Sequence, residues 1–195
     1  AWVAKAKKQA GALPGGPAVD MPAGPSELLV IADRDADAVV AAADLLSQAE
    51  HDPDAQVLLV TESRGLIDAV LEEVELQLET LPRADIARAA LAEGRAIRVN
   101  SITEACDVSN LYGPEHLAIQ TLGADQWVPR ITAAGAVFVG PNAAEALGDY
   151  ASGPSHVLPT DGAARTMGGV TTASFMTSMS VQSVTAAGAA ALAPV

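Results

Sequence analysis

The sequence predicts an α/β fold in which a parallel sheet carries helices on both faces. The first observation is that apolar runs of strand length recur along the chain, with helical patterns between them. The second is that the first of these runs, ELLVIAD over 27–33, is continuously apolar, as expected for a strand of a parallel sheet that is covered on both faces. Strands that alternate with helices form βαβ units, whose right-handed crossovers place successive strands parallel in one sheet.

After an N-terminal helix end and a connector, the first half of the chain alternates between predicted strands and helices. Residues 1–10 read as the end of a helix, and GALPGGPAVDMPAGPS, residues 11–26, reads as a Gly/Pro-rich connector. ELLVIAD, residues 27–33, is the first predicted strand because its apolar run is unbroken. The elements that follow are a helix over 35–51, a strand over 56–62 (QVLLVTE), helices over about 64–79 and 84–93, and a strand over 96–100 (AIRVN).

The second half continues the pattern. Ser101 and Glu104 form a capping box, which predicts the start of a helix. The elements that follow are a strand over 116–121 (HLAIQT), a helix over about 124–134, a strand over 136–140 (AVFVG), a short helix over 142–152, a loop to about 169, and a final helix within 170–195. We therefore expect a Rossmann-like, incomplete sheet plus a C-terminal helical arm. The main domain is expected over 26–170, with the end of a neighbouring domain over 1–25 and the start of the arm over 171–195.

Composition narrows the function classes. A net charge of −13 counts against nucleic-acid or anionic-membrane binding, because both require clustered Lys and Arg. The single cysteine, Cys106, excludes an internal disulfide framework and fits a reducing, cytoplasmic setting, and its helical context predicts a buried side chain. No secretory signal or transmembrane span is predicted. The two best-known phosphate-binding loops, GxGxxG and GxxxxGK[ST], are absent.

Polar residues from four segments are expected to meet at one edge of the sheet. In a βαβ unit the helix runs antiparallel to its strands, so its C-terminus lies at the edge where the strands begin. This edge is opposite the usual ligand crevice of doubly wound folds. The residues expected there are Ser26 before the first strand, Gln48 and His51 at the end of the 35–51 helix, Glu115 and His116 at the opening of the fourth strand, and Asp149 in the helix after the fifth strand.

Taken singly, each of these residues has a plainer interpretation. Gln48 and His51 are three apart, hence about 60° apart on one helix face, and that face is turned away from the apolar stripe. They could be a solvated helix end near the negative pole of the helix dipole. Ser26 and the Glu115–His116 pair could lie in exposed turns, and Asp149 could be a helix-end charge. His156 reads as a hydrogen-bonding loop residue.

Taken together, the same residues suggest chemistry. Imidazole nitrogen with oxygen donors suits a borderline divalent ion such as zinc. An adjacent Glu–His pair, here Glu115 and His116, is suited to activating water or moving protons. Three protein ligands (Gln48, His51 and Asp149) would leave the metal shell open, and an amide oxygen is a weak zinc ligand. The pattern alone thus indicates a possible metal-assisted site.

The motifs resemble those of the histidinol dehydrogenase family. The matching segments are GPSELLVIAD, DLLSQAEHDPDAQVLLVT, NLYGPEHLAIQT and GDYASGPSHVLPT, and the resemblance runs from Ala1 to Val195. It implies an enzyme dependent on zinc and NAD that oxidises L-histidinol to L-histidinal and then to L-histidine, ending histidine biosynthesis. It also implies that Gln48, His51 and Asp149 bind both zinc and substrate, and that Ser26 contacts substrate.

The resemblance also implies roles for the Glu–His pair. His116 would contact the substrate and take protons during the oxidations, and Glu115 would activate the water that attacks the aldehyde. In such an enzyme the metal positions and polarises the substrate.

Compared with the family, the chain reads as a fragment. The N-terminal half, which carries much of the NAD site, is not included, so the NAD-contacting residues stay unknown and residues 1–25 read as the end of that NAD-side domain. The family's C-terminal extension supplies a glutamate and a last histidine ligand to the partner subunit of a homodimer, and nothing after Asp149 matches either. We therefore expect the isolated chain to hold zinc poorly and to lack dehydrogenase activity.

Two other functions remain open. A zinc-dependent hydrolase would use Glu115 to activate a metal-bound water, but it normally has three strong ligands or an HExxH helix, and neither is present. A non-catalytic remnant of the dehydrogenase would keep the sheet and the dimer surface without the chemistry.

Overall fold

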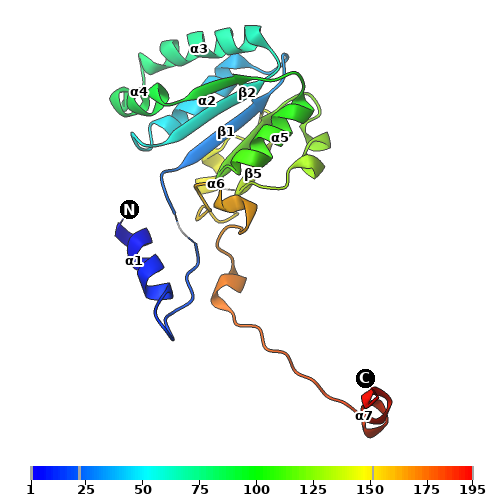
Figure 1. Cartoon of the computed structure of the whole chain (residues 1–195). Helices are drawn as coiled ribbons and strands as arrows, with labels where there is room; N and C mark the ends of the chain where they lie inside the picture. The colour runs from blue at the N-terminus through cyan, green and yellow to red at the C-terminus, as the bar shows by residue number, and fades with distance from the viewer. Residues whose placement is uncertain (1, 22, 151, 195) are drawn as a thin grey trace.

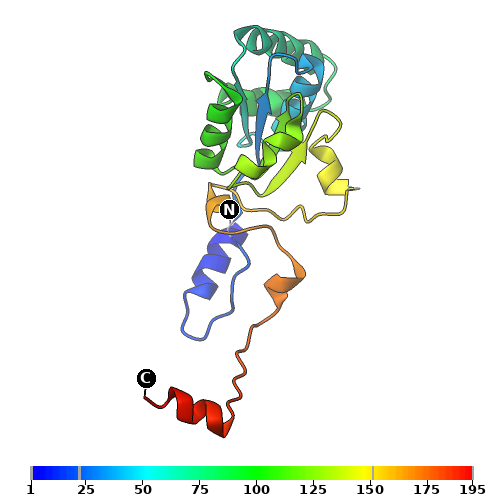
Figure 2. The same ribbon diagram turned by 90° about the vertical axis from the view of Figure 1, so that its right-hand side faces the viewer.

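The computed structural model describes residues 2–21, 23–150 and 152–194. Its centre is a five-stranded parallel sheet with the strand order β3-β2-β1-β4-β5. Helices cover both faces of this sheet, as Figures 1 and 2 show. The predicted α/β fold is confirmed.

The elements follow the predicted order closely. The strands are β1 (Glu27–Ala32), β2 (Gln56–Thr61), β3 (Arg95–Arg98), β4 (His116–Gln120) and β5 (Ala136–Val139). The α-helices are α1 (Trp2–Gly11), α2 (Ala38–Ala49), α3 (Arg64–Leu78), α4 (Ala84–Ala92), α5 (Ile102–Tyr112), α6 (Ala146–Tyr150) and α7 (Ala186–Leu192). Short 3₁₀ turns are η1 (Ala124–Gln126), η2 (Val128–Arg130), η3 (Ala163–Arg165) and η4 (Thr172–Phe175).

The central strand β1 supplies side chains to two separate cores. Leu28 and Val30 pack with α2, α3 and α4, while Leu29 and Ile31 pack with α5 on the opposite face. All four side chains are fully buried. This two-sided burial explains why the strand is apolar at consecutive positions.

The helix α2 is shorter than predicted at both ends. The Asp37 carboxylate accepts a hydrogen bond from the Val39 N–H at 2.9 Å and caps the helix, which therefore begins at Ala38 instead of residue 35. The helix ends at Ala49, and His51 lies in the following turn. Helical spacing therefore does not fix the relative direction of the Gln48 and His51 side chains.

The helix predicted over 124–134 is wrong. That stretch forms η1 and η2 and then runs without helix into β5. Pro129 has no N–H to continue an α-helix, and the β-branched Ile131 and Thr132 disfavour one. The Asn110 side chain from α5 also accepts a hydrogen bond from the Thr132 N–H at 2.7 Å. The helix predicted over 142–152 is likewise confined to α6.

The two end segments lie outside the body built on the sheet, as both views of the ribbon show (Figures 1 and 2). Neither α1 nor α7 has a buried residue, and the chain between η4 and α7 is free of regular structure. The division into residues 1–25, 26–170 and 171–195 stays a prediction. Among the helices of the described residues, none is long and apolar enough to cross a membrane.

Candidate active site

The amino ends of β1 and β4 lie side by side, and the predicted residues of both segments meet there. Leu28 of β1 is in register with His116 of β4, so Ser26 and Glu115 lie just before two paired strands. The Ser26 side chain lies close enough to the Glu115 carboxyl group to lower its pKa. Chain direction therefore predicted correctly that Ser26, Glu115 and His116 share an edge.

Glu27 joins these residues into one buried unit. The Glu27 N–H donates to Glu115 Oε2 at 2.9 Å, and the Glu115 N–H donates to Glu27 Oε2 at 3.2 Å. The other oxygen of Glu27 accepts the Asp161 N–H at 2.8 Å, which ties the loop after β5 and α6 to this edge. Sequence reasoning missed Glu27, although a charge that opens an apolar strand is a signal that could have found it.

Burial changes the proton affinity of Glu115. The residue is only 6% exposed, and this desolvation raises the pKa of its carboxyl group from 4.5 to about 7. Hydrogen bonds from the Glu27 N–H and from Ser26 lower the pKa in part, while the neighbouring Glu27 and Glu145 carboxylates raise it further. A carboxyl group that titrates near neutrality can serve as a general base or acid at working pH.

The ring of His116 is fixed by the backbone of β1. Its Nδ1 lies 3.1 Å from the Glu27 carbonyl oxygen, which can only accept a hydrogen bond. Nδ1 therefore carries the proton, and Nε2 is left with a free lone pair when the ring is neutral. The ring is 6% exposed and lies 6.0 Å from the Phe138 ring, centroid to centroid.

Gln48 of α2 is buried with an unsatisfied oxygen. The residue is 3% exposed, and its Oε1 has no hydrogen-bond partner among the described residues. A buried carbonyl oxygen without a partner is uncommon, because burying the oxygen without a hydrogen bond costs free energy. His51 is exposed in the turn after α2, where its carbonyl oxygen accepts a hydrogen bond from Arg83 Nη2 at 3.2 Å. Its imidazole is thus open to a ligand.

A second set of buried polar residues, absent from the sequence-based prediction, connects α2 to the segment before α6. Ser47 Oγ donates to Glu145 Oε2 at 3.0 Å, and Glu145 Oε1 lies 3.7 Å from His116 Nε2. The Asp44 carboxylate accepts a hydrogen bond from Gln120 Nε2 at 2.7 Å and lies close to the Glu145 backbone N–H. Desolvation, together with the nearby Glu145 charge, raises the pKa of Asp44 from 3.8 to about 6.

Spacing offers a signal that could have found these residues. Asp44 precedes Gln48 by one helical turn, and Glu145 precedes Asp149 by the same interval. Two of the three predicted metal-binding residues, Gln48 and Asp149, thus have a carboxylate four positions before them. Ser47, which stands next to Gln48 in the sequence, gives no comparable signal.

The predicted metal ligands are only partly described. Asp149 lies in α6, and its side chain falls outside the described part of the structure. Among the described side chains, no group of three or more His, Cys, Asp and Glu is placed to hold a metal ion. Gln48 is an amide and so lies outside that set of residue types. The ligand set Gln48, His51 and Asp149 therefore remains a prediction.

Two other residues named from the sequence lie apart from this edge. His156 is exposed in the loop after α6. Cys106 is buried on α5 as predicted, and this burial raises the pKa of its thiol, which keeps it protonated and unreactive.

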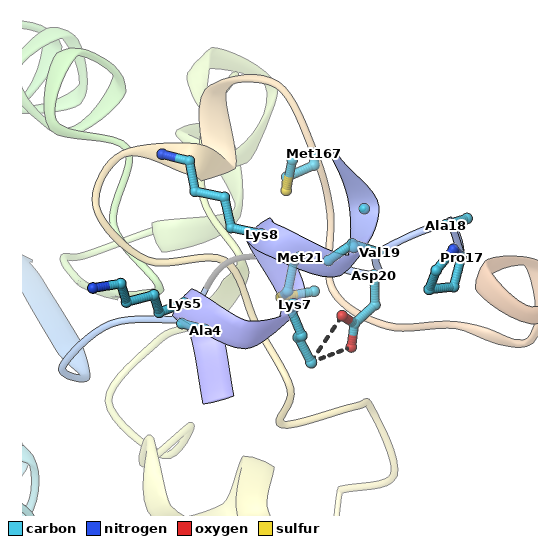
Figure 3. A pocket seen from close by; sticks show the side chains of 11 residues that line it. Ala4, Lys5, Lys7, Lys8, Pro17, Ala18, Val19, Asp20, Met21 and Met167 are labelled. Carbon is cyan, nitrogen blue, oxygen red and sulfur yellow. Dashed lines mark hydrogen bonds and ion pairs between the residues drawn. The ribbon is translucent and has the colours of Figure 1, made fainter. Parts of the chain in front are cut away.

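A cavity of about 680 Å³ lies between α1 and the connector (Figure 3). Its lining includes Val19, Met21 and Met167, and Lys7 pairs with Asp20 at its rim at 2.8 Å. The cavity shares no residue with the edge formed by β1, β4 and the end of α2.

Comparison with known proteins identifies the relatives of this chain. The family model described as "Histidinol dehydrogenase" matches residues 1–195. A histidinol dehydrogenase of Xanthomonas euvesicatoria is 55% identical over 187 residues, which are 96% of this chain and 43% of that protein. One of Vibrio cholerae is 52% identical over 194 residues, which cover 100% of this chain and 45% of that protein.

A solved structure agrees with these sequences. The crystal structure of histidinol dehydrogenase from Elizabethkingia anophelis is 46% identical to this chain and superposes with a TM-score of 0.95. The match covers 99% of this chain and 44% of that one. The chain spans less than half the length of the relatives it matches.

Proposed function

Because the chain belongs to the histidinol dehydrogenase family, we propose that it carries the substrate and metal side of a site that oxidises L-histidinol to L-histidine with NAD⁺. The observation that carries this proposal is the buried unit of Glu115, Glu27 and His116 at the amino edge of the sheet. An acid/base pair with a fixed ring and a carboxyl group tuned to neutrality is what the two oxidations require.

Zinc fits the residues on the α2 side. Gln48 presents a buried carbonyl oxygen without a partner, and His51 presents an exposed imidazole three residues later. We propose that these two and Asp149 hold zinc and the substrate in an open mixed shell of nitrogen and oxygen donors. The Ser47–Glu145 hydrogen bond supports this proposal, because it ties the segment of Gln48 to the segment of Asp149. When bound, zinc would orient and polarise the substrate, and NAD⁺ would accept hydride.

The two members of the Glu–His pair divide the proton chemistry. His116 takes the hydroxyl proton of the alcohol on Nε2, because its Nδ1 is committed to the Glu27 carbonyl oxygen. Glu115 removes a proton from the water that attacks the aldehyde, since only a hydrated aldehyde can lose hydride to become an acid. Its raised pKa of about 7 leaves it partly ionised at neutral pH and basic enough for this task. Ser26 contacts the substrate beside them.

The proposal also covers the binding partners of the protein and its location in the cell. The family resemblance supports a homodimer in which the partner subunit supplies the last zinc ligand, and a cytoplasmic location. It gives no support to a nucleic-acid or membrane partner, in keeping with a net charge of −13.

A chimera tests the proposed function. The aligned stretch of this chain, 187 residues long, would replace the matching segment of the Xanthomonas relative, which is 55% identical. We expect this chimera to form NADH from L-histidinol, and the isolated 195-residue chain to form none. A folded chimera without turnover would contradict the proposed function, and turnover by the isolated chain would contradict its expected inactivity.

Glu115→Gln in the same chimera tests the division of labour. The amide keeps the shape of the side chain but cannot take a proton from water. Stopped-flow measurements that start from histidinol or from histidinal should show the aldehyde step slowed by about a hundredfold or more, and the alcohol step slowed much less. Equal slowing of both steps would remove the assigned role of Glu115.

A further inference from the structure

A buried carboxylate with no assigned role lies next to the ring of His116. Glu145 is 6% exposed, and its Oε1 is 3.7 Å from His116 Nε2. A buried carboxylate is costly to desolvate unless other groups compensate it. One of its oxygens has a hydrogen bond from Ser47, while the other faces the imidazole.

Two contacts from α2 hold Glu145 in this position. Ser47 Oγ donates to Glu145 Oε2 at 3.0 Å, which orients the carboxylate. The Asp44 carboxylate lies close to the backbone N–H of Glu145, in the segment before α6. Asp44 is itself fixed by Gln120 at the end of β4, at 2.7 Å. The position of Glu145 is therefore set by α2, which is itself fixed to β4.

The ring geometry defines what Glu145 can do. Nδ1 of His116 donates to the Glu27 carbonyl oxygen, so any proton that the ring gains arrives on Nε2. The imidazolium then has a backbone acceptor at one nitrogen and a carboxylate at the other. Because both partners are acceptors, they stabilise the charged ring more than the neutral one.

We propose that Glu145 is a positioning residue that stabilises the imidazolium form of His116, and this inference rests on the proposed function. In the alcohol step the substrate hydroxyl loses its proton to Nε2 while its carbon loses hydride to NAD⁺. The positive charge that appears on the ring is balanced by the Glu145 carboxylate. Ser47 keeps that carboxylate aimed at the ring.

The other charged groups around the His116 ring are less suited than Glu145 to balance its positive charge. Glu115 Oε2 lies 3.6 Å from Nδ1, but that nitrogen already donates to the Glu27 carbonyl oxygen, and the raised pKa of Glu115 leaves it partly protonated at neutral pH. The Glu27 carboxylate accepts N–H groups from Glu115 and Asp161. From α2, Asp44 contacts Gln120 and the Glu145 backbone.

The test is an NMR titration of the purified chain, which needs neither zinc nor NAD⁺. The chain has three histidines, and the ¹⁵N shifts of each ring report its tautomer and its imidazolium fraction. Glu145→Gln removes the charge but can still accept the Ser47 hydrogen bond. We expect the ratio of imidazolium to neutral ring at His116 to fall about tenfold at a given pH, with the Nδ1–H tautomer unchanged.

Asp44→Asn is the matched control, since it removes a second buried carboxylate from the same layer without touching the ring. It should change the ratio at His116 by far less than Glu145→Gln does. Equal ratios in the wild type and Glu145→Gln, or equal effects of the two substitutions, would overturn the proposal. If Glu145→Gln does not fold, the wild type still decides the question. There the ¹³C shift of the Glu145 carboxyl group should follow the protonation of His116, and its failure to do so would equally overturn the proposal.

This outcome is separable from that of the proposed function. The titration reads only the ring and its carboxylate, so it can succeed in a chain that never oxidises histidinol. Conversely, a chimera that turns over histidinol while Glu145→Gln leaves His116 unaffected would contradict only the role of Glu145.

Discussion

At the scale of single residues, the burial of Glu115 couples stability to pH. Its pKa is about 7 in the folded chain against an ordinary 4.5, so the folded state holds a proton that the unfolded chain releases within this window. The stabilisation from this proton is complete below pH 4.5 and is lost as the pH rises through 7. The proton on Asp44 stabilises the fold in the same way over a lower pH range, because the pKa of Asp44 is raised from 3.8 to about 6.

Glu115→Gln should therefore flatten the pH dependence of stability. Between pH 5 and pH 8 we expect the Tm of the wild type, measured by calorimetry, to fall relative to that of Glu115→Gln. The comparison of the two proteins cancels the other titrating groups. A difference in Tm that stays constant across this range would mean that Glu115 ionises as it does in the unfolded chain.

At the scale of elements, the strand β1 carries the stability of the sheet. Leu29 of β1 is fully buried against α5. Leu111, which lies on α5, is 76% exposed. Leu29→Ala should lower the free energy of unfolding by about 2–5 kcal/mol, because it removes buried methyl groups and leaves a cavity. Leu111→Ala should change it by about 0.5 kcal/mol or less. Urea denaturation measures both, and similar losses would contradict the assignment of the core.

The elements also show how far sequence reasoning reaches. All five strands were predicted, and the fully buried β1 was the clearest, because a strand buried on both faces has no polar alternation to obscure it. The helix over 124–134 failed because Pro129 and a tertiary contact from Asn110 decide that stretch. The ends of α2 were missed for a related reason. The alanine-rich sequence favours a longer helix, but the Asp37 cap and the turn before Pro53 set its two ends.

At the scale of the whole molecule, the topology explains why part of the site was predictable. Chain direction alone places residues that precede β1 and β4 at one edge, and Ser26, Glu115 and His116 do lie there together. Side-chain packing was not predictable in this way. Glu27, Glu145 and the unpartnered Gln48 oxygen acquire their significance from burial, which depends on contacts between residues 88 or more positions apart, such as Glu27 with Glu115.

The molecule also has an exposed apolar stretch in its C-terminal part. The chain from η4 onwards exposes large apolar side chains, of which Phe175 is 82% and Met179 85% exposed. Exposed apolar groups in such number mark surfaces of interaction. This agrees with a chain that spans less than half the length of its relatives.

The central claim, that Gln48, His51 and Asp149 would hold zinc for the substrate, is tested most directly by titrating the chain with Zn²⁺ in a calorimeter. We predict weak binding by the wild type, and a loss of affinity of at least about tenfold in both Gln48→Ala and His51→Ala, since even residues that only support a ligand cost that much. His156→Ala is the matched control, because it removes the third histidine from a loop outside the site, and it should bind as the wild type does. Zinc binding that survives in His51→Ala and is lost in His156→Ala would contradict the account.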